Sequence, residues 1–210
     1  MFSHPAAYNK RFYCPLCDKQ NHKEAFLMKL HLADSAKELK STRSIVMCAA
    51  LIALYIALDS LSVFPLSTQK YTVAFISLAL LGYGFGIVPS ALAAFACDLV
   101  GYLIKPMGAY HPGFAISKIL TCAIFALFLY RKEIKLWRII ASRTIINIFI
   151  NGFLNAYWLA SLYSSKAYSV ILIDHLYKNL ILLPFEIVVL FFLLKAFKKI
   201  SLSLNKNNRS

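Results

Sequence analysis

The sequence lacks the short motifs that mark common catalytic sites. Its 210 residues contain no H-E-x-x-H metalloprotease motif, no G-x-S-x-G nucleophile turn and no Walker A phosphate loop. The chain is therefore not expected to hydrolyse ATP by itself, and we predict neither a catalytic residue nor a cofactor. One alternative stays open: Asp98 and Glu186 lie within apolar sequence and could serve a small intramembrane enzyme.

Cysteine is also scarce, with five residues in the chain. Cys14 and Cys17 form a C-x-x-C pair that suits zinc, and His22 and His31 could complete a set of four ligands. A second C-x-x-C pair or a closely spaced pair of histidines is missing. We therefore predict no metal site, keep Cys14 and Cys17 as a weak candidate, and retain a polar cytoplasmic tail with reduced thiols as the alternative.

Acidic residues are few: nine aspartates and glutamates stand against 23 lysines and arginines, which gives a net charge of +14. Such a charge could indicate a nucleic-acid partner. The basic residues, however, gather within residues 37–43, 131–143 and 195–209, and each cluster borders an apolar segment. This is the distribution that the positive-inside rule describes, and anionic lipid headgroups are the expected counter-charge. We expect a lipid bilayer as partner and no nucleic acid.

Long apolar segments are what the sequence does contain. Hydrophobic residues make up 60% of the chain and the mean hydropathy is +0.63, whereas soluble domains average about 45–50% apolar residues. Because a membrane-spanning helix needs about 20 mostly apolar residues, residues 45–197 have room for about six. The predicted fold class is an all-α membrane protein, a bundle of six transmembrane helices. The expected spans are residues 44–64, 72–85, 90–104, 114–130, 145–163 and 170–197.

An even number of spans places both termini on one side of the membrane. All three basic clusters then lie on that side, and the outer loops carry few charges, so both termini are expected in the cytoplasm. The chain accordingly divides into a polar cytoplasmic N-terminal extension (1–43), a transmembrane domain (44–199) and a basic cytoplasmic tail (200–210).

The first span carries a stripe of small residues. Ala49, Ala53 and Ala57 recur every four residues and so share one helix face. Small residues at this spacing let another helix approach closely in lipid. The partner helix could belong to this chain or to a separate subunit.

A polar interruption between two apolar segments marks a candidate ligand site. Residues 108–114 combine glycine, proline and aromatic residues, and Pro112 suits the first turn of the helix that follows. The amino end of that helix would attract a carboxylate. The fifth span adds asparagines spaced four residues apart, which line one helix face. Aromatic surfaces, amide edges and a few cations suit a flat heteroaromatic ligand that carries negative charge.

The residues expected to bind this ligand lie toward the outer ends of the spans. They are Lys105, Tyr110, His111, Phe114, Asn151, Asn155, Trp158, Tyr163, Lys178 and Asn179. A plainer interpretation stays open. In it, the asparagines hydrogen-bond between helices, and Trp158 and Tyr163 belong to the aromatic belt at the membrane interface.

Four segments can be compared with motifs of a known family. GAYHPGFAIS at residues 108–117 is similar to G-x-Y-F-P-G-F-T-L-S, and DLVG at 98–101 matches part of G-D-L-x-G. NGFLNAYWL at 151–159 is similar to N-x-x-L-N-T-x-W-L, and KNLILLP at 178–184 to K-N-L-I-x-L-P. Over residues 44–199 the chain thus resembles the substrate-binding S-component of energy-coupling factor (ECF) vitamin transporters, most of all the folate-specific branch.

The resemblance implies a membrane protein that binds folate in an outward-facing pocket, with Ser117 added to the site. It also implies that the alanine stripe docks on a transmembrane coupling subunit driven by two ATP-binding subunits, in the plasma membrane of a prokaryote. The sequence departs from the branch's pattern in lacking an arginine at the start of the second span and in carrying Lys118 and His111 where a small residue and an aromatic residue are usual. A different vitamin or heterocycle therefore stays open as the ligand.

Overall fold

Helices dominate the computed structural model, which describes residues 42–66, 69–106, 110–162 and 168–207. The apolar runs predict this, because a backbone in lipid must satisfy its own hydrogen bonds and a helix does so within one segment. The elements are α2 Thr42–Ser60, β1 Val63–Leu66, β2 Gln69–Tyr71, α3 Phe75–Phe85, α4 Ile87–Ile104, α5 Pro112–Leu129, α6 Leu136–Ile145, η1 Ile146–Leu154, α7 Asn155–Leu162 and α8 Tyr168–Asn207. Since α6, η1 and α7 follow one another without a break, the described residues form six helical bodies.

Four of these bodies are long and apolar enough to cross a membrane: Ile87–Ile104, Pro112–Leu129, Leu136–Leu162 and Tyr168–Lys199. The prediction of six helices is thus confirmed for the described residues. Four of the six are long and apolar enough to span a membrane. The other two, Ser44–Ser60 and Phe75–Phe85, are shorter apolar helices. At 1.5 Å per residue, α3 is about 16 Å long, roughly half of a hydrocarbon core of about 30 Å.

Two features differ from the expected element boundaries. The loop expected between the first two spans contains a short antiparallel hairpin, in which Val63 pairs with Tyr71, and the other regular elements of the described residues are helices. The basic stretch 131–143 lies between two expected spans and is expected to be a loop on the cytoplasmic side. That prediction is wrong for its second half, because α6 begins at Leu136 and contains Arg143 as a buried residue. Local charge suggested a loop, whereas a tertiary partner described below holds Arg143 inside the bundle.

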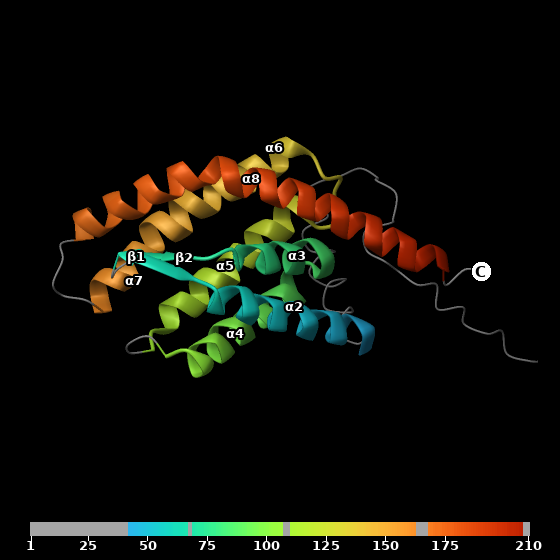
Figure 1. Cartoon of the computed structure of the whole chain (residues 1–210), viewed down its shortest axis with the longest axis horizontal. Helices are drawn as coiled ribbons and strands as arrows, with labels where there is room; N and C mark the ends of the chain where they lie inside the picture. The colour runs from blue at the N-terminus through green and yellow to red at the C-terminus, as the bar shows by residue number, and fades with distance from the viewer. Residues whose placement is uncertain (1–41, 67–68, 107–109, 163–167, 208–210) are drawn as a thin grey trace, which may run out of the picture.

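The helices form two groups (Figure 1). One contains α2, α3, α4 and α5, and the other contains α8 alongside the continuous helix α6–η1–α7. Within the first group α3 packs closely on α5: a Cβ added at Gly82 would lie 2.8 Å from the Cβ of Phe125. The turn between α3 and α4 needs Gly86, whose φ of 78° is strained for any residue with a side chain.

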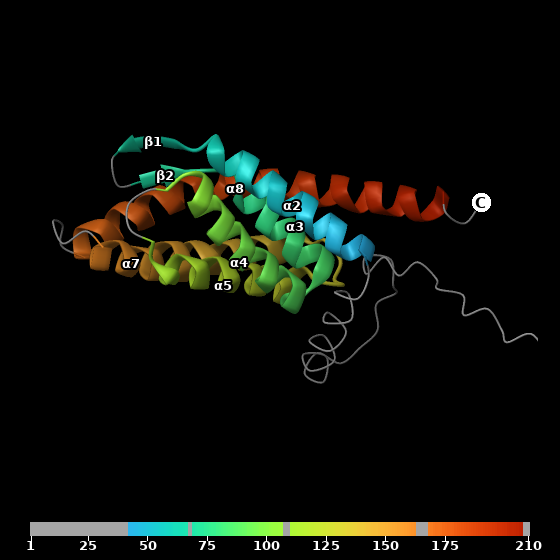
Figure 2. The ribbon, with the colours of Figure 1, turned by 90° about the horizontal axis from the view of Figure 1, so that it is seen from below.

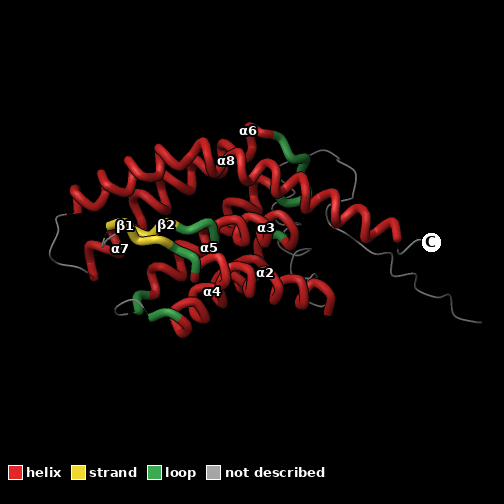
Figure 3. The backbone as a smooth tube through the Cα atoms, in the orientation of Figure 1, coloured by secondary structure: helices red, strands yellow, loops and turns green. Residues whose placement is uncertain are grey.

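The connections define two ends of the bundle (Figures 2 and 3). The described chain begins, at α2, and finishes, at α8, at the same end, where α5 also finishes and α6 starts. The opposite end carries the β1–β2 hairpin, the start of α5, the end of α7 and the start of α8. The candidate site residues from α5, α7 and α8 therefore approach one another near this second end.

Candidate ligand-binding cavity

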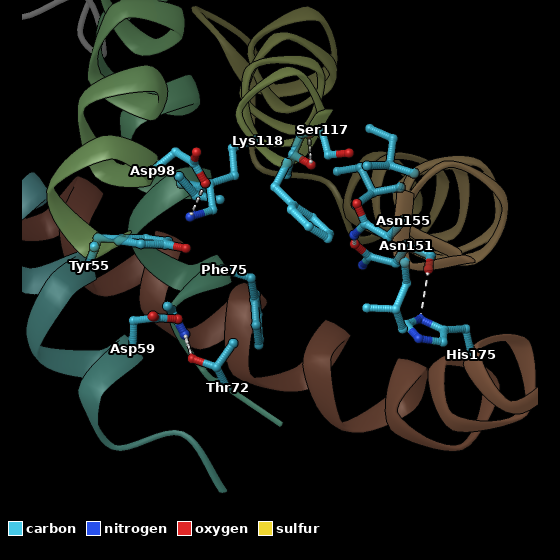
Figure 4. Close-up of a pocket in the computed structure, with 18 of the residues that line it drawn as sticks. Tyr55, Asp59, Thr72, Phe75, Asp98, Ser117, Lys118, Asn151, Asn155 and His175 are labelled. Atoms are coloured by element: carbon cyan, nitrogen blue, oxygen red, sulfur yellow. Dashed lines mark hydrogen bonds and ion pairs between the residues drawn. The ribbon is translucent and has the colours of Figure 1, made fainter. Parts of the chain in front are cut away.

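A cavity of about 430 Å³ lies between the two helix groups. This volume is within the range of about 300–1,000 Å³ that small-molecule sites occupy. Two walls face each other across it (Figure 4). We call Tyr55, Asp98 and Lys118, from α2, α4 and α5, the lysine wall. The opposite wall, from α6, η1, α7 and α8, is the asparagine wall, in which Arg143, Asn151, Asn155, His175, Asn179 and Glu186 line the cavity. We include Asn147 in this wall, although it does not line the cavity, because it is hydrogen-bonded to Asn151, Asn179 and Glu186.

An ion pair dominates the lysine wall. Lys118 Nζ lies 2.9 Å from Asp98 Oδ1, and the same ammonium group lies 4.9 Å from the centre of the Tyr55 ring. The Asp98 side chain is only 7% exposed, while that of Lys118 is 25% exposed. The second oxygen, Asp98 Oδ2, is buried and has no hydrogen-bond partner among the described residues. This wall therefore keeps a strong acceptor available to a ligand.

A row of hydrogen-bonded amides forms the asparagine wall. Asn155 Nδ2 donates to Asn151 Oδ1 at 3.3 Å, and Asn151 Nδ2 donates to Asn147 Oδ1 at 3.0 Å. The asparagines thus share one helix face, as their spacing predicts. They lie on or directly beside η1, a π-helical segment, and such segments occur frequently at functional sites.

The row ends on a buried ion pair. Arg143 donates to both oxygens of Glu186, from Nε at 2.9 Å and from Nη2, and Asn147 Nδ2 donates to Glu186 Oε2 at 2.8 Å. The Arg143 guanidinium also lies 4.1 Å from the centre of the Phe75 ring, in cation–π geometry. Three donors and an aromatic face compensate for the burial of these charges, which is costly when partners are missing.

Two residues of α8 hold η1 from the side. His175 Nδ1 lies 3.1 Å from the carbonyl oxygen of Asn151, and Asn179 Nδ2 donates to the carbonyl oxygen of Asn147 at 3.1 Å. The other ring nitrogen, His175 Nε2, is buried without a hydrogen-bond partner in the described part of the chain. Asn155 Oδ1 is likewise buried without a partner there, and both residues line the cavity.

Aromatic rings close the cavity where α5 begins. Pro112 occupies the first turn of α5, as predicted, and the Nδ1 atom of His111 accepts a hydrogen bond from the Gly113 amide at 3.0 Å. The His111 ring lies 5.1 Å from that of Trp158. A Cβ added at Gly113 would lie 2.3 Å from Trp158 Cδ2, so only glycine permits this contact. Desolvation, with a smaller contribution from Asp98, raises the pKa of Tyr110 in the preceding loop.

Most residues expected from the sequence to bind a ligand line the cavity. These are Lys105, Tyr110, His111, Phe114, Ser117, Asn151, Asn155, Lys178 and Asn179. Trp158 lies behind His111 and does not itself line the cavity, although its Nε1 atom is buried without a partner among the residues described. Tyr163 lies outside the described residues. The binding roles of all these residues stay predictions.

Sequence reasoning missed several lining residues, above all Tyr55, Phe75 and Arg143. Two are aromatic residues within apolar helices, where nothing in the sequence separates them from packing residues, and Arg143 was assigned to a loop. Lys118 was noticed only as a departure from a motif. Its spacing of 20 residues from Asp98 offers no local signal for their ion pair.

The other predicted sites have different outcomes. Ala49, Ala53 and Ala57 are exposed on α2, so the stripe is available to a partner, and its docking role stays a prediction. The weak zinc candidate of Cys14 and Cys17 lies outside the described residues. Within the described ranges, no group of three metal-binding side chains could hold an ion.

A bundle of apolar helices with a cavity that charged and amide side chains help to line is the arrangement of a membrane protein with a small-molecule site. No family model matches the chain. The folate transporter FolT of Clostridium novyi is 32% identical over 117 residues, which cover 56% of this chain and 67% of that protein. The folate transporter FolT of Leuconostoc mesenteroides is 27% identical over 158 residues, or 73% of this chain and 85% of that one.

A solved structure agrees with these relatives. The crystal structure of FolT bound with folic acid superposes with a TM-score of 0.67 at 28% identity, covering 72% of this chain and 91% of that chain. The chain belongs to the family of FolT folate transporters. It is a membrane protein, and the relatives are transporters and not enzymes, in agreement with the sequence-based expectation.

Proposed function

We propose that this chain is the folate-binding subunit of an importer and that it holds the vitamin between its two walls. The observation that carries the proposal is the set of buried polar atoms around the cavity that have no partner among the described residues. Those on lining residues are Asp98 Oδ2, Ser117 Oγ, Asn155 Oδ1 and His175 Nε2. Buried polar atoms are nearly always hydrogen-bonded, so unpartnered ones gathered at one cavity indicate the ligand that satisfies them.

The chemistry of folate complements these atoms. Its 2-amino-4-oxopteridine ring offers N–H donors along one edge and a flat face for aromatic side chains such as Phe114. Its glutamate tail carries carboxylates, and three lysines line the same cavity: Lys105, Lys118 and Lys178. The names of the relatives and of the solved structure support the choice of folate within this chemical class.

Binding of folic acid to the detergent-purified protein, without ATP, tests this proposal. We expect stoichiometric quenching of tryptophan fluorescence at submicromolar folic acid. Asn155→Ala is expected to weaken binding, since Asn155 lines the cavity, while Ser161→Ala is the matched control at an exposed position of α7. Unchanged affinity in both Asn155→Ala and Trp158→Ala would contradict this site.

We further propose that the chain is an S-component of the ECF type. In this role it docks on a transmembrane coupling subunit that two ATP-binding subunits drive, in the plasma membrane of a prokaryote. Support comes from the exposed alanine stripe on α2, because small residues allow close helix approach in lipid. Both termini, including the segments 1–43 and 200–210, are assigned to the cytoplasm in this proposal, on the basis of the positive-inside distribution.

Co-purification tests the docking face. Ala53→Trp places a bulky ring in the stripe and is expected to abolish co-purification with the coupling subunit while leaving folic acid binding intact. Ala196→Trp makes the same change at an exposed alanine of α8 and is expected to leave the complex unaffected. Retention of the complex by Ala53→Trp would place the docking face elsewhere.

A second candidate ligand, another vitamin or heterocycle with a smaller negative charge, is favoured by one observation. Lys118 is already paired with Asp98, so part of its charge is neutralised before a ligand arrives. A competition panel of heterocyclic vitamins against folic acid separates the two candidates. Displacement of bound folic acid by another vitamin at lower concentration would favour this second ligand.

A further inference from the structure

The amide row of the asparagine wall is a relay with a defined direction, and Asn151 and Asn155 of this row are labelled in Figure 4. Asn155 donates to Asn151, Asn151 donates to Asn147, and Asn147 donates to Glu186. Each asparagine side chain offers one NH₂ donor and one carbonyl acceptor, so each amide passes the same orientation to the next. The relay therefore has a fixed beginning, the Glu186 carboxylate, and a free end, the Asn155 carbonyl oxygen.

The carboxylate determines the direction of the whole row. An ionised carboxylate can only accept hydrogen bonds, so Asn147 must turn its NH₂ group toward Glu186 and its oxygen toward Asn151. The same requirement passes to Asn151 and then to Asn155. Arg143 holds the carboxylate in place with donors to both of its oxygens. Asn155 Oδ1 is consequently left as an acceptor at the end of the row. Asn155 lines the cavity, and this oxygen is buried without a partner among the described residues.

The same reasoning determines which ring nitrogen of His175 carries the proton. The carbonyl oxygen of Asn151 can only accept, so His175 Nδ1 is the donor at 3.1 Å. In the neutral ring the other nitrogen, Nε2, is then an acceptor. It is buried at the cavity without a partner among the described residues. The asparagine wall therefore offers the cavity two acceptors, from α7 and α8.

We propose that Glu186 is a positioning residue whose carboxylate, acting through Asn147 and Asn151, makes this wall select ligands that bring N–H donors to its two acceptors. The proposal rests on the proposed function, because it specifies how the same cavity chooses among pteridines. A 2-amino-4-oxopteridine carries such donors, in its 2-amino group and at N3–H. In the 4-amino analogue, N3 is an acceptor and would face an acceptor of the wall.

The test compares folic acid with 4-aminofolic acid. We expect the wild-type protein to bind folic acid roughly tenfold or more tightly than the 4-amino analogue, since an unsatisfied buried acceptor pair is costly. Glu186→Gln can donate from its amide to Asn147 while still accepting from Arg143, so the relay can reverse and place Asn155 Nδ2 in the cavity. The preference ratio is then expected to fall to about threefold or less, roughly half of the wild-type discrimination energy.

Three variants control this experiment. Glu133→Gln makes the same chemical change at an exposed position outside the cavity and should leave the ratio unchanged. Glu186→Asp keeps an acceptor-only group and should retain most of the preference. Arg143→Met combined with Glu186→Gln removes the unpaired guanidinium, and it is measured if Glu186→Gln alone does not fold. An equal loss of affinity for both ligands in Glu186→Gln would overturn the proposal, because it would show a purely structural role.

A ligand-free measurement separates this proposal from the proposed function. In protein labelled with ¹⁵N-asparagine, the side-chain NH₂ protons of Asn155 should exchange slowly in the wild type, where they lie within the relay. They should exchange faster in Glu186→Gln, where they face the cavity. Equal exchange rates would overturn the relay even if folic acid binds. Failure of the wild type to bind either pteridine would overturn the proposed function alone, with the exchange rates still deciding the relay.

Discussion

The two walls of the cavity each contain an ion pair, but the pairs differ in completeness. Arg143 and Glu186 share two hydrogen bonds, and a third donor, Asn147, completes the carboxylate. On the facing wall Lys118 binds one oxygen of Asp98, and the other oxygen has no partner within the described ranges. A completed pair adds rigidity to a wall, whereas an incomplete pair keeps hydrogen-bonding capacity for a ligand.

This difference indicates that the two walls have different roles in ligand binding. The asparagine wall is preorganised, since its amides and imidazole are held by one another and by backbone carbonyls before any ligand binds. The lysine wall, with its partly exposed ammonium group, can adjust to the charge of the ligand. Preorganisation lowers the cost of binding, so changes on the asparagine wall should affect stability first and changes on the lysine wall should affect affinity more.

The largest expected effect is on the completed pair. Arg143→Leu leaves the Glu186 carboxylate buried without its cation, and breaking a buried pair in this way costs about 3–5 kcal/mol. Thermal unfolding in detergent, followed by circular dichroism, measures the loss. The double variant Arg143→Leu/Glu186→Leu should recover much of it, because no unpaired charge remains. A single variant as stable as the wild type would contradict the structural role of this pair.

A smaller effect is expected where the walls meet at Gly113. Gly113→Ala brings a Cβ to within 2.3 Å of Trp158, so the indole must move. Overpacking of this kind costs about 1–3 kcal/mol, and folic acid affinity should fall with it. Gly84→Ala is the matched control, since its added Cβ meets only Phe197 at an ordinary 3.9 Å. Equal affinities for the two variants would show that the contact is dispensable.

The incomplete pair should give the next effect. Lys118→Met leaves Asp98 without its cation, and because Lys118 is partly exposed we expect about 1–2 kcal/mol of destabilisation, between the values for surface and buried pairs. Folic acid affinity, measured by fluorescence quenching, should fall further than stability alone explains. Lys195→Met, an exposed lysine of α8 outside this cavity, is the control. An affinity equal to the wild type would exclude Lys118 from ligand binding.

The sequence predicts the helices and part of the site because both depend on local patterns. Apolar runs set where helices form in lipid, and the four-residue spacing of Asn151 and Asn155 places them on one face in advance. The ion-pair partners of charged residues cannot be predicted from local patterns. Arg143 and Glu186 are 43 residues apart, and only the packing of α6 on α8 brings them together.

The same limit explains the other misses. The spacing of the asparagines predicts a shared helix face but does not distinguish the π-helical geometry of η1 from an α-helix. The Ser117 hydroxyl illustrates the point at one residue. The motif that contains it suggests a role, while the structure supplies the physical reason, a buried oxygen without a partner in the described residues.

The smallest expected effect concerns two buried serines that differ in this respect. Ser142 Oγ donates to the Ile139 carbonyl at 3.1 Å, so Ser142→Ala should cost about 0.5–1.5 kcal/mol of stability and leave affinity unchanged. Ser117→Ala removes a hydroxyl that makes no such bond among the described residues, so the ligand-free protein should be as stable as the wild type. Saturating folic acid should stabilise the Ser117→Ala variant less than the wild type, because the variant lacks the hydroxyl that we expect the ligand to hydrogen-bond. A lower stability of ligand-free Ser117→Ala, with unchanged stabilisation by folic acid, would instead show that Ser117 serves the packing of α5.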